Sequence, residues 1–250
     1  MKRLSIVIPI YQNESNIPST YAQIKSECEK HAGEFDYEII FVDDGSTDNS
    51  NMKLRAAYDS DPGRIVLIRL SRNFGQVPAI LAGFSQATGD CLMAISADLQ
   101  DPPELLGRMF ASWRRGHKLV IAVRTARDDG FLHATASRLF FGLMKLFVPE
   151  LPVGGFDCWL MDRELRDPFI RRARKNSFFQ GHLLSLGYKP VAIFYRRRKR
   201  ELGKSQYTLR KKLHFFKEAF VYLGINLGER RPDDSAAPPY LIADTLSGRL

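Results

Sequence analysis

The stretch "YEIIFVDDGSTDNS", residues 37–50, runs from a strand through a turn into a helix. Ile39–Val42 form an unbroken apolar run, which is typical of a strand buried on both faces of a sheet. Gly45 interrupts the run, and the small polar residues behind it are those that favour helix N-termini. A buried strand that leads directly into a helix is the repeating unit of a parallel α/β sheet.

The same unit recurs along the first half of the chain. We predict further strands at 4–10, 64–70, 91–96 and 118–123, and helices at about 16–33, from about 46, at 75–87 and at 103–115. This alternation predicts an α/β fold, with a doubly wound, mostly parallel sheet and helices on both faces. Beyond residue 124 the pattern is less regular, and we predict helices at 131–147, 176–187 and 209–223 and strands at 157–162 and 189–196.

Composition indicates a globular protein of 250 residues, with 44% hydrophobic and 26% charged residues. We expect one main domain over residues 1–208, an amphipathic helix over 209–227 and a disordered tail over 228–250, which is rich in Pro, Asp and Ser. The three cysteines are far apart and form no CxxC pair, so we interpret them as reduced cytosolic thiols. No apolar segment approaches the roughly 18 residues that cross a bilayer, so we expect no membrane-spanning segment.

Positive charge is concentrated in one segment. The net charge is +9, and residues 196–212, "RRRKRELGKSQYTLRKK", hold nine Lys or Arg and one Glu. A solvated charged surface, a nucleic-acid site and a site for lipid phosphate on an anionic membrane are the three interpretations. Only Tyr195 and Tyr207 interleave the charges with aromatic rings, and no nucleic-acid motif is present, so we expect no nucleic-acid partner. We favour lipid phosphate, because each nearby Lys or Arg adds roughly 1 kcal/mol of attraction to acidic lipids.

Polar motifs follow the carboxyl ends of the first four predicted strands: Tyr11, Asp43–Gly45, Ser71–Asn73 and Ser96–Asp98. Open α/β sheets bind ligands at this edge, so we predict a site there. No glycine-rich phosphate loop follows the first strand, which argues against dinucleotide oxidoreductases and P-loop proteins. In "DDGSTD" the two adjacent acids could hydrogen-bond a base or a ribose. The alternative is that these residues only form a turn and a helix cap.

The stretch "ISADLQDPPE", residues 95–104, combines two predicted features. Asp101, the two prolines and Glu104 are typical of a helix start, with Asp101 as the N-terminal cap. Asp98 lies close to where a nucleotide would place its phosphates, which need a cation such as Mg²⁺ or Mn²⁺. We therefore predict a metal site at Asp98, helped by the amide oxygen of Gln100.

Six motifs occur in order over residues 3–215: "SIVIPIYQNESNI", "FVDDGSTDNS", "RLSRNFGQVPAILAGFSQATGD", "SADLQDPPE", "DCWLMDRE" and "RRRKRELGKSQY". Together they resemble glycosyltransferase family 2, and most of all its branch of polyprenyl-phosphate sugar transferases, to which dolichol-phosphate mannose synthase and bactoprenol glucosyltransferases belong. The resemblance implies the nucleotide-sugar-binding glycosyltransferase A type of fold, followed by a C-terminal amphipathic helix.

The resemblance also implies site residues. A nucleotide sugar would be bound by Pro9, Tyr11, Glu14, Asp43, Asp44, Ser96, Ala97, Asp98, Gln100 and Arg124. Asp98 and Gln100 would hold Mg²⁺ or Mn²⁺, and Asp157 and Asp98 would be the catalytic residues. A lipid phosphate would be bound by Arg198, Arg200, Lys204 and Ser205.

The implied activity is an inverting transfer of a sugar from a UDP- or GDP-sugar to a polyprenyl phosphate, in cell-envelope or surface glycan synthesis. It implies a cytoplasmic protein at the inner face of an anionic membrane, and the sequence leaves a homo-oligomer open. A soluble glycan or protein acceptor is one alternative, and a non-catalytic remnant that binds nucleotide sugar is another.

Two features depart from the family pattern. Ser96 stands where the first acid of the family's D-x-D motif is expected, so one metal ligand would be a neutral hydroxyl. Many bacterial relatives continue into two membrane helices where this chain reads "FFKEAFVYLGINLGERRPDD", and we interpret the region near Asn226 as a truncation or frameshift that replaces the membrane anchor.

Overall fold

The computed structural model describes residues 1–125, 142, 144–146, 148–173, 178–198, 217, 219, 221 and 238–248. The strands are β1 (Arg3–Ile10), β2 (Asp36–Asp43), β3 (Ile65–Leu70), β4 (Cys91–Ala94), β5 (Leu119–Arg124), β6 (Trp159–Asp162), β7 (Val191–Tyr195) and β8 (Ile242–Ser247). The helices are α1 (Ile17–Lys30), α2 (Ser50–Ser60), α3 (Gln76–Gln86), α4 (Leu105–Arg114), the 3-10 helix η1 (Arg163–Leu165), α6 (Arg166–Ala173) and α7 (Phe179–Leu184).

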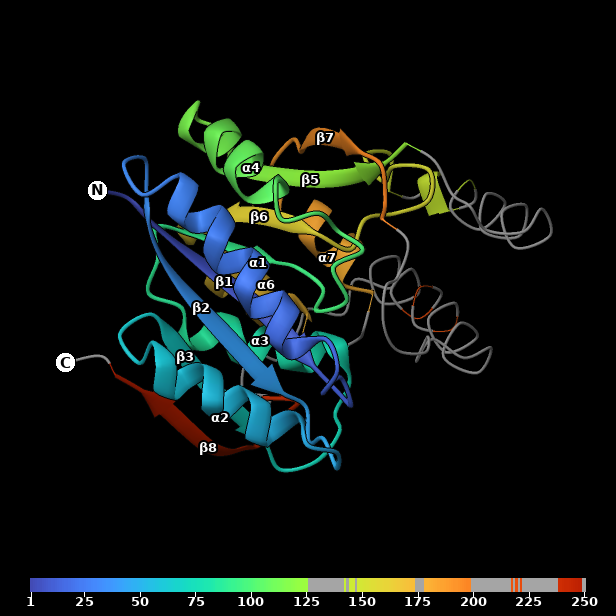
Figure 1. Ribbon diagram of the computed structural model, residues 1–250. Helices are drawn as coiled ribbons and strands as arrows, with labels where there is room; N and C mark the ends of the chain where they lie inside the picture. The colour runs from blue at the N-terminus through green and yellow to red at the C-terminus, as the bar shows by residue number, and fades with distance from the viewer. Residues whose placement is uncertain are drawn as a thin grey trace.

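The described strands form one sheet in the order β7-β5-β6-β4-β1-β2-β3-β8 (Figure 1). β4, β1, β2 and β3 are parallel to their neighbours in this series, and β5 is parallel to β7. β6 runs antiparallel between β4 and β5, and β8 runs antiparallel to β3 at the other edge. The predicted doubly wound, mostly parallel sheet is therefore confirmed.

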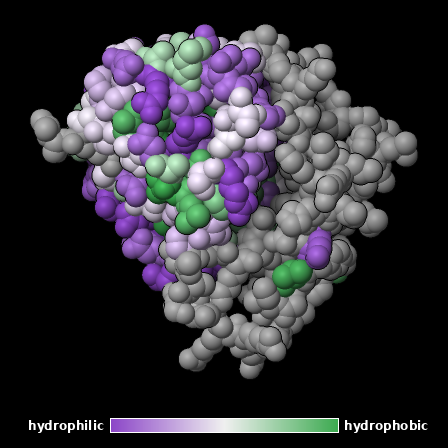
Figure 2. All heavy atoms as spheres, turned by 90° about the horizontal axis from the view of Figure 1, so that it is seen from below, coloured by the Kyte–Doolittle hydropathy of each residue, from purple (hydrophilic) through white to green (hydrophobic). Residues whose placement is uncertain are grey.

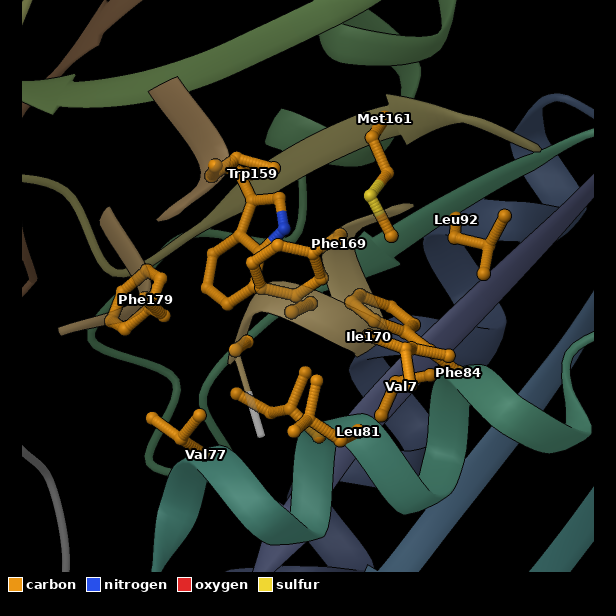
Figure 3. Close-up of a cluster of buried hydrophobic side chains, with 14 of the residues drawn as sticks. Val7, Val77, Leu81, Phe84, Leu92, Trp159, Met161, Phe169, Ile170 and Phe179 are labelled. Carbon is orange, nitrogen blue, oxygen red and sulfur yellow. The ribbon is translucent and has the colours of Figure 1, made fainter. Parts of the chain in front are cut away.

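Helices cover both faces of the sheet, and each face has its own apolar core. On one face α1, α2 and α4 pack on the sheet through residues such as Ile24, Leu54 and Phe110. On the other face α3, α6 and α7 surround Trp159, as the close-up in Figure 3 shows. The rings of Phe84, Phe156, Phe169 and Phe179 all contact the Trp159 ring, with centroids 4.5 to 6.3 Å apart.

The absence of a side chain at Gly83 lets α3 lie against β1. A Cβ atom at this position would be 2.4 Å from Cγ1 of Val7, which is far inside van der Waals contact. The close approach fixes the height of α3 over the sheet. The loop before α3, at the carboxyl edge of the sheet, is therefore held close to the loop after β2.

Two elements and one cap differ from the sequence prediction. The tail was expected to be disordered over 228–250, but Ile242–Ser247 form β8 and join the sheet, because β3 offers an open edge to pair with. α6 was not predicted, since only Phe169, Ile170 and Ala173 of its eight residues are buried. Asp101 does not cap a helix, because α4 begins at Leu105, its N-cap is Glu104, and no side chain bonds there.

Several predicted elements cannot be compared with the structure. Residues 131–147 lie mostly outside the described part of the chain, as do 199–216 and 222–237. Among the described residues no helix is long and apolar enough to cross a membrane. Figure 2 views the molecule from below and shows polar and apolar side chains intermixed on this surface. Met52 on α2 is exposed, and so are Leu241 and Ile242 at the start of β8.

Candidate active site

The carboxyl ends of the parallel strands meet at one edge of the sheet, on the right in Figure 1. β6 runs the other way, so its amino end and the residues before it lie at the same edge. Twelve predicted site residues stand at this edge: Pro9, Tyr11, Glu14, Asp43, Asp44, Ser96, Ala97, Asp98, Gln100, Arg124, Asp157 and Arg198. Arg200, Lys204 and Ser205 lie outside the described residues.

Asp43 and Asp44, at the end of β2, are both buried and both accept hydrogen bonds from the backbone. The Ser46 N–H donates to Asp43 at 2.9 Å, which closes the turn expected from the sequence. Asp44 reaches a different loop, where it accepts from the N–H groups of Phe74 and Gly75 at 2.7 and 2.9 Å. Asp43 therefore takes part in the turn, whereas Asp44 ties the β2 loop to the start of α3.

Gly45 allows these two loops to touch. Its φ is +68°, and a Cβ atom there would lie 2.4 Å from the carbonyl carbon of Arg72. A side chain at this position would therefore meet both backbone strain and a direct clash. The contact places Arg72 and Asn73 beside the two aspartates.

The loop after β1 is held to its neighbours on both sides. Glu14 accepts from the Asn49 N–H at 2.8 Å, and this bond fixes the approach to α2. Asn13 and Thr20 donate to the carbonyl of Ala97 at 3.2 and 2.7 Å. The loops that follow β1, β2 and β4 thus form one connected rim.

Pro9 and Tyr11 lie on the β1 side of this rim. Pro9 pairs with Val42 in the β1–β2 register and is half-buried, and Tyr11 is half-buried directly after the strand. Gln12, the next residue, adopts a φ of +46°, which turns the chain sharply away from the sheet. The Gln12 N–H donates to Oγ of Ser46 at 3.0 Å, so the chain just after Tyr11 lies beside the β2 loop.

The β4 loop gathers oxygen atoms around Ser96. The Ser96 Oγ is 3.0 Å from Oδ1 of Asp98 and 2.8 Å from Oδ2 of Asp101. The Gln100 N–H also donates to Asp98, at 3.2 Å, and Leu99 between them has a φ of +55°. This conformation turns the loop back on itself, so Asp98 and Asp101 approach one hydroxyl from two sides.

A second group of polar side chains joins this loop from β5, β6 and β7. The Tyr195 hydroxyl donates to Asp101, which is fully buried, and Nε of Arg124 lies 3.4 Å from the same hydroxyl. Burial, and next the Asp101 carboxylate, raise the pKa of Tyr195 above its usual range, so this hydroxyl stays a donor. Arg124 forms an ion pair with Asp157, whose side chain is 42% exposed.

Arg198 connects the basic segment to the β4 loop. Its backbone N–H donates to the Gln100 carbonyl at 2.9 Å, and its guanidinium makes two bonds to Glu104, at 2.7 and 3.0 Å. A further bond of 3.2 Å joins it to Gln23 of α1. The segment that begins at Arg196 therefore leaves β7 directly beside Asp98 and Gln100.

The donor atoms of the β4 loop suit a hard divalent cation. The carboxylate of Asp98, the hydroxyl of Ser96 and the amide oxygen of Gln100 are all oxygen ligands, which Mg²⁺ and Mn²⁺ prefer. Among the described residues no three His, Cys, Asp or Glu side chains gather as a metal site. Asp98, Ser96 and Gln100 would supply part of a coordination shell, and the phosphates of a bound nucleotide would complete it.

Three polar residues of the site escaped prediction from the sequence: Asp101, Tyr195 and Gln180. Asp101 looked like a helix cap because prolines follow it. Gln180, buried on α7, donates to the Phe156 carbonyl at 2.6 Å and so holds the residue next to Asp157. Only the polar interruption of an apolar helix, "FFQGHLL", marks Gln180 in the sequence.

Comparison with known proteins shows the family of this chain. The sequence model described as "Glycosyl transferase family 2" matches residues 5–168, which is more than half of the chain. The chain belongs to glycosyl transferase family 2. It is 38% identical over 211 residues to the uncharacterized glycosyltransferase YkcC of Bacillus subtilis (strain 168), and this match covers 84% of the chain and 64% of YkcC. The family 2 chain thus spans less than two thirds of the length of that relative.

Solved structures show the same fold. Glucosyl-3-phosphoglycerate synthase from Mycobacterium tuberculosis, in complex with Mn²⁺, UDP and glucosyl-3-phosphoglycerate, superposes with a TM-score of 0.67 at 19% identity, covering 91% of this chain and 80% of that one. The mannosyltransferase PcManGT from Pyrobaculum calidifontis, in complex with GDP-Man and Mn²⁺, gives a TM-score of 0.67 at 17% identity, covering 95% and 66%. At these identities the likeness establishes the fold of this family 2 chain.

Proposed function

We propose that this family 2 chain transfers a sugar, with inversion, from a UDP- or GDP-sugar to a polyprenyl phosphate at the inner face of a membrane. The observation that carries the proposal is the junction of Arg198 with Gln100. Their 2.9 Å backbone bond places the start of the basic segment against the predicted diphosphate loop. An anionic acceptor would therefore meet positive charge directly beside the donor.

The donor half of the proposal rests on the connected rim. Tyr11 offers a ring and Asp43 and Asp44 offer carboxylates next to the β1 and β2 ends, where a base and ribose would be bound. Asp98, Ser96 and Gln100 face the adjoining position, where a diphosphate with Mg²⁺ or Mn²⁺ would lie. When bound, the cation would stabilise the charge that develops on the departing nucleoside diphosphate.

The acceptor half rests on the chemistry of a phosphate nucleophile. A phosphate monoester oxygen is already ionised at neutral pH, so attack on the anomeric carbon needs no strong base. Positioning and charge stabilisation would then supply most of the rate. Asp157 suits an orienting role because Arg124, whose own side chain is only 11% exposed, already binds its carboxylate.

A transfer assay tests the proposal. The full chain would be incubated with radiolabelled UDP- and GDP-sugars, Mg²⁺ or Mn²⁺ and a short polyprenyl phosphate, and we expect label in the lipid extract. Asp157→Asn should reduce this product about 100-fold, since misplacement at the reacting centre has effects of this size. Asp167→Asn is the matched control, because Asp167 is exposed on α6 and forms an ion pair with Arg166, away from the site. Label in a soluble glycan or protein instead, or nucleotide binding without any transfer, would overturn the proposal.

Membrane association is tested separately. We expect the chain to sediment with vesicles that contain anionic lipids and to remain in solution with neutral ones. The bound fraction should fall as salt is raised from low to physiological ionic strength, because screening weakens attraction between exposed charges. Equal sedimentation with both kinds of vesicle would contradict the location at an anionic membrane surface.

A further inference from the structure

We propose that Asp101, held by Tyr195, is a positioning residue that supplies negative charge to the metal site through the Ser96 hydroxyl. The inference rests on the proposed function, because it concerns the cation that would accompany the nucleotide sugar. It explains how a site with a serine in place of an acid can still bind that cation.

The geometry around Ser96 gives the first step. Two carboxylate oxygens lie within hydrogen-bond distance of one hydroxyl, Asp101 at 2.8 Å and Asp98 at 3.0 Å. A serine hydroxyl has one proton to donate and lone pairs with which to accept. Ser96 can therefore satisfy only one of the two carboxylates with its proton at any moment.

The surroundings of Asp101 decide which carboxylate receives the proton. Asp101 is fully buried, and a buried carboxylate is stable only when hydrogen bonds replace the water it has lost. Tyr195 donates to one of its oxygens, and Ser96 is the donor to the other. Asp98 is partly exposed and also accepts from the Gln100 N–H, so it depends less on Ser96. The Ser96 hydroxyl consequently donates its proton to Asp101 rather than to Asp98.

With the proton directed to Asp101, Ser96 turns its lone pairs toward Asp98. Two acceptors then face each other at 3.0 Å, an arrangement that favours a cation at Asp98. The hydroxyl oxygen becomes more electron-rich because its proton is shared with a carboxylate, as outer-shell partners of metal ligands commonly arrange. The negative charge that an acid at position 96 would place at the metal is thus supplied by Asp101, through its hydrogen bond with Ser96.

Tyr195 extends the effect to the reaction centre. Its hydroxyl donates to Asp101 and lies 3.4 Å from Nε of Arg124, which pairs with Asp157. The chain of contacts therefore runs from Asp98 to Asp157 through four intervening side chains.

The test measures Mn²⁺ binding to the full chain, with UDP and separately with GDP, from the electron paramagnetic resonance signal of free Mn²⁺. We expect Ser96→Ala, Asp101→Asn and Tyr195→Phe each to raise the dissociation constant of Mn²⁺ about tenfold or more, the range seen for outer-shell partners. Ser96→Asp should bind Mn²⁺ at least as tightly as the wild type. Ser112→Ala and Tyr37→Phe, matched changes at buried hydroxyl residues outside the site, should stay within about twofold.

The decisive measurement is the double variant Ser96→Ala with Asp101→Asn. If Asp101 acts through Ser96, its substitution has no further effect once the hydroxyl is gone, so the double variant matches Ser96→Ala. An equal loss from Asp101→Asn in both backgrounds would overturn the inference, as would unchanged Mn²⁺ binding in Asp101→Asn or Tyr195→Phe. Absence of Mn²⁺ binding to the wild type with both nucleotides would overturn it too. Mn²⁺ binding that behaves as expected, without transfer to polyprenyl phosphate, would refute only the proposed function.

Discussion

Replacing Asp44 by asparagine separates the two interpretations of the "DDGSTD" motif. The Asp44 carboxylate accepts two backbone N–H bonds, from Phe74 at 2.7 Å and from Gly75 at 2.9 Å. Asparagine keeps one acceptor oxygen but turns an NH₂ group toward the other N–H. One donor then faces another donor, and the start of α3 loses one bond.

The structure gives the size of the effect. A buried N–H left without an acceptor costs about 1–3 kcal/mol, and here the lost acceptor is charged, so we expect about 2 kcal/mol of lost stability. For a domain of this size that corresponds to a fall in melting temperature of about 4–8 °C. Asp59→Asn, an exposed position on α2, is the matched control and should shift the melting temperature by less than about 2 °C.

The assay is thermal unfolding with and without UDP and GDP. If Asp44 also contacts the nucleotide, the ligand will stabilise Asp44→Asn less than it stabilises the wild type, since the shift depends on the dissociation constant. If Asp44 serves only the loop, both proteins will gain the same stabilisation from the ligand. A melting temperature of Asp44→Asn equal to that of the wild type would refute the hydrogen-bond reasoning itself.

Three further changes test other parts of the structure. Asp98→Ala should abolish the dependence of transfer activity on Mg²⁺ or Mn²⁺ together with most of the activity, whereas retained metal-dependent activity would refute the metal assignment. Burial, and next the nearby Arg172, lower the pKa of His182 to about 4 from an unfolded value near 6.5, so the unfolded chain binds the extra proton first. Stability should therefore fall by about 3 kcal/mol as the pH drops from 6.5 to 4, and urea unfolding of His182→Gln should show a smaller fall over this range. Gln180→Met removes the donor to the Phe156 carbonyl and should lower kcat about tenfold while KM for the nucleotide sugar stays the same; a change in KM alone would argue against a role in placing Asp157.

The sequence predicted the central sheet well because its strands are locally encoded. β1, β2 and β3 each contain a continuous apolar run of at least four residues bounded by polar residues, so period and length alone identify them. β8 was missed because five of its six residues are exposed, and only the pairing with β3, far away in the sequence, makes it a strand. A strand whose stability comes from a distant partner leaves no local pattern to read.

The sequence predicted at which edge of the sheet the candidate site residues lie, but not the hydrogen bonds between their side chains. Parallel strands bring their carboxyl ends to one edge, so the place of Tyr11, Asp44 and Asp98 follows from topology. Asp101 was misread because the prolines behind it match a helix start, while its partner Tyr195 is 94 residues away. Local rules for helix caps cannot detect a partner at that distance, and the tertiary bond prevails.

The hydrogen bonds of the rim hold together the loops at this edge of the sheet. Thr20 holds the Ala97 carbonyl, Glu14 holds the Asn49 N–H, and Arg198 holds the Gln100 carbonyl. Each bond joins loops from different strands, so the edge keeps its shape through contacts among its own residues. A site that is fixed in this way loses little conformational freedom when a ligand binds, which favours affinity. Because the residues of the candidate site also hold its loops together, we expect a substitution here to change both stability and ligand binding. Comparison of variants in the presence and absence of ligand, rather than activity alone, is therefore the measurement that assigns a role to each residue.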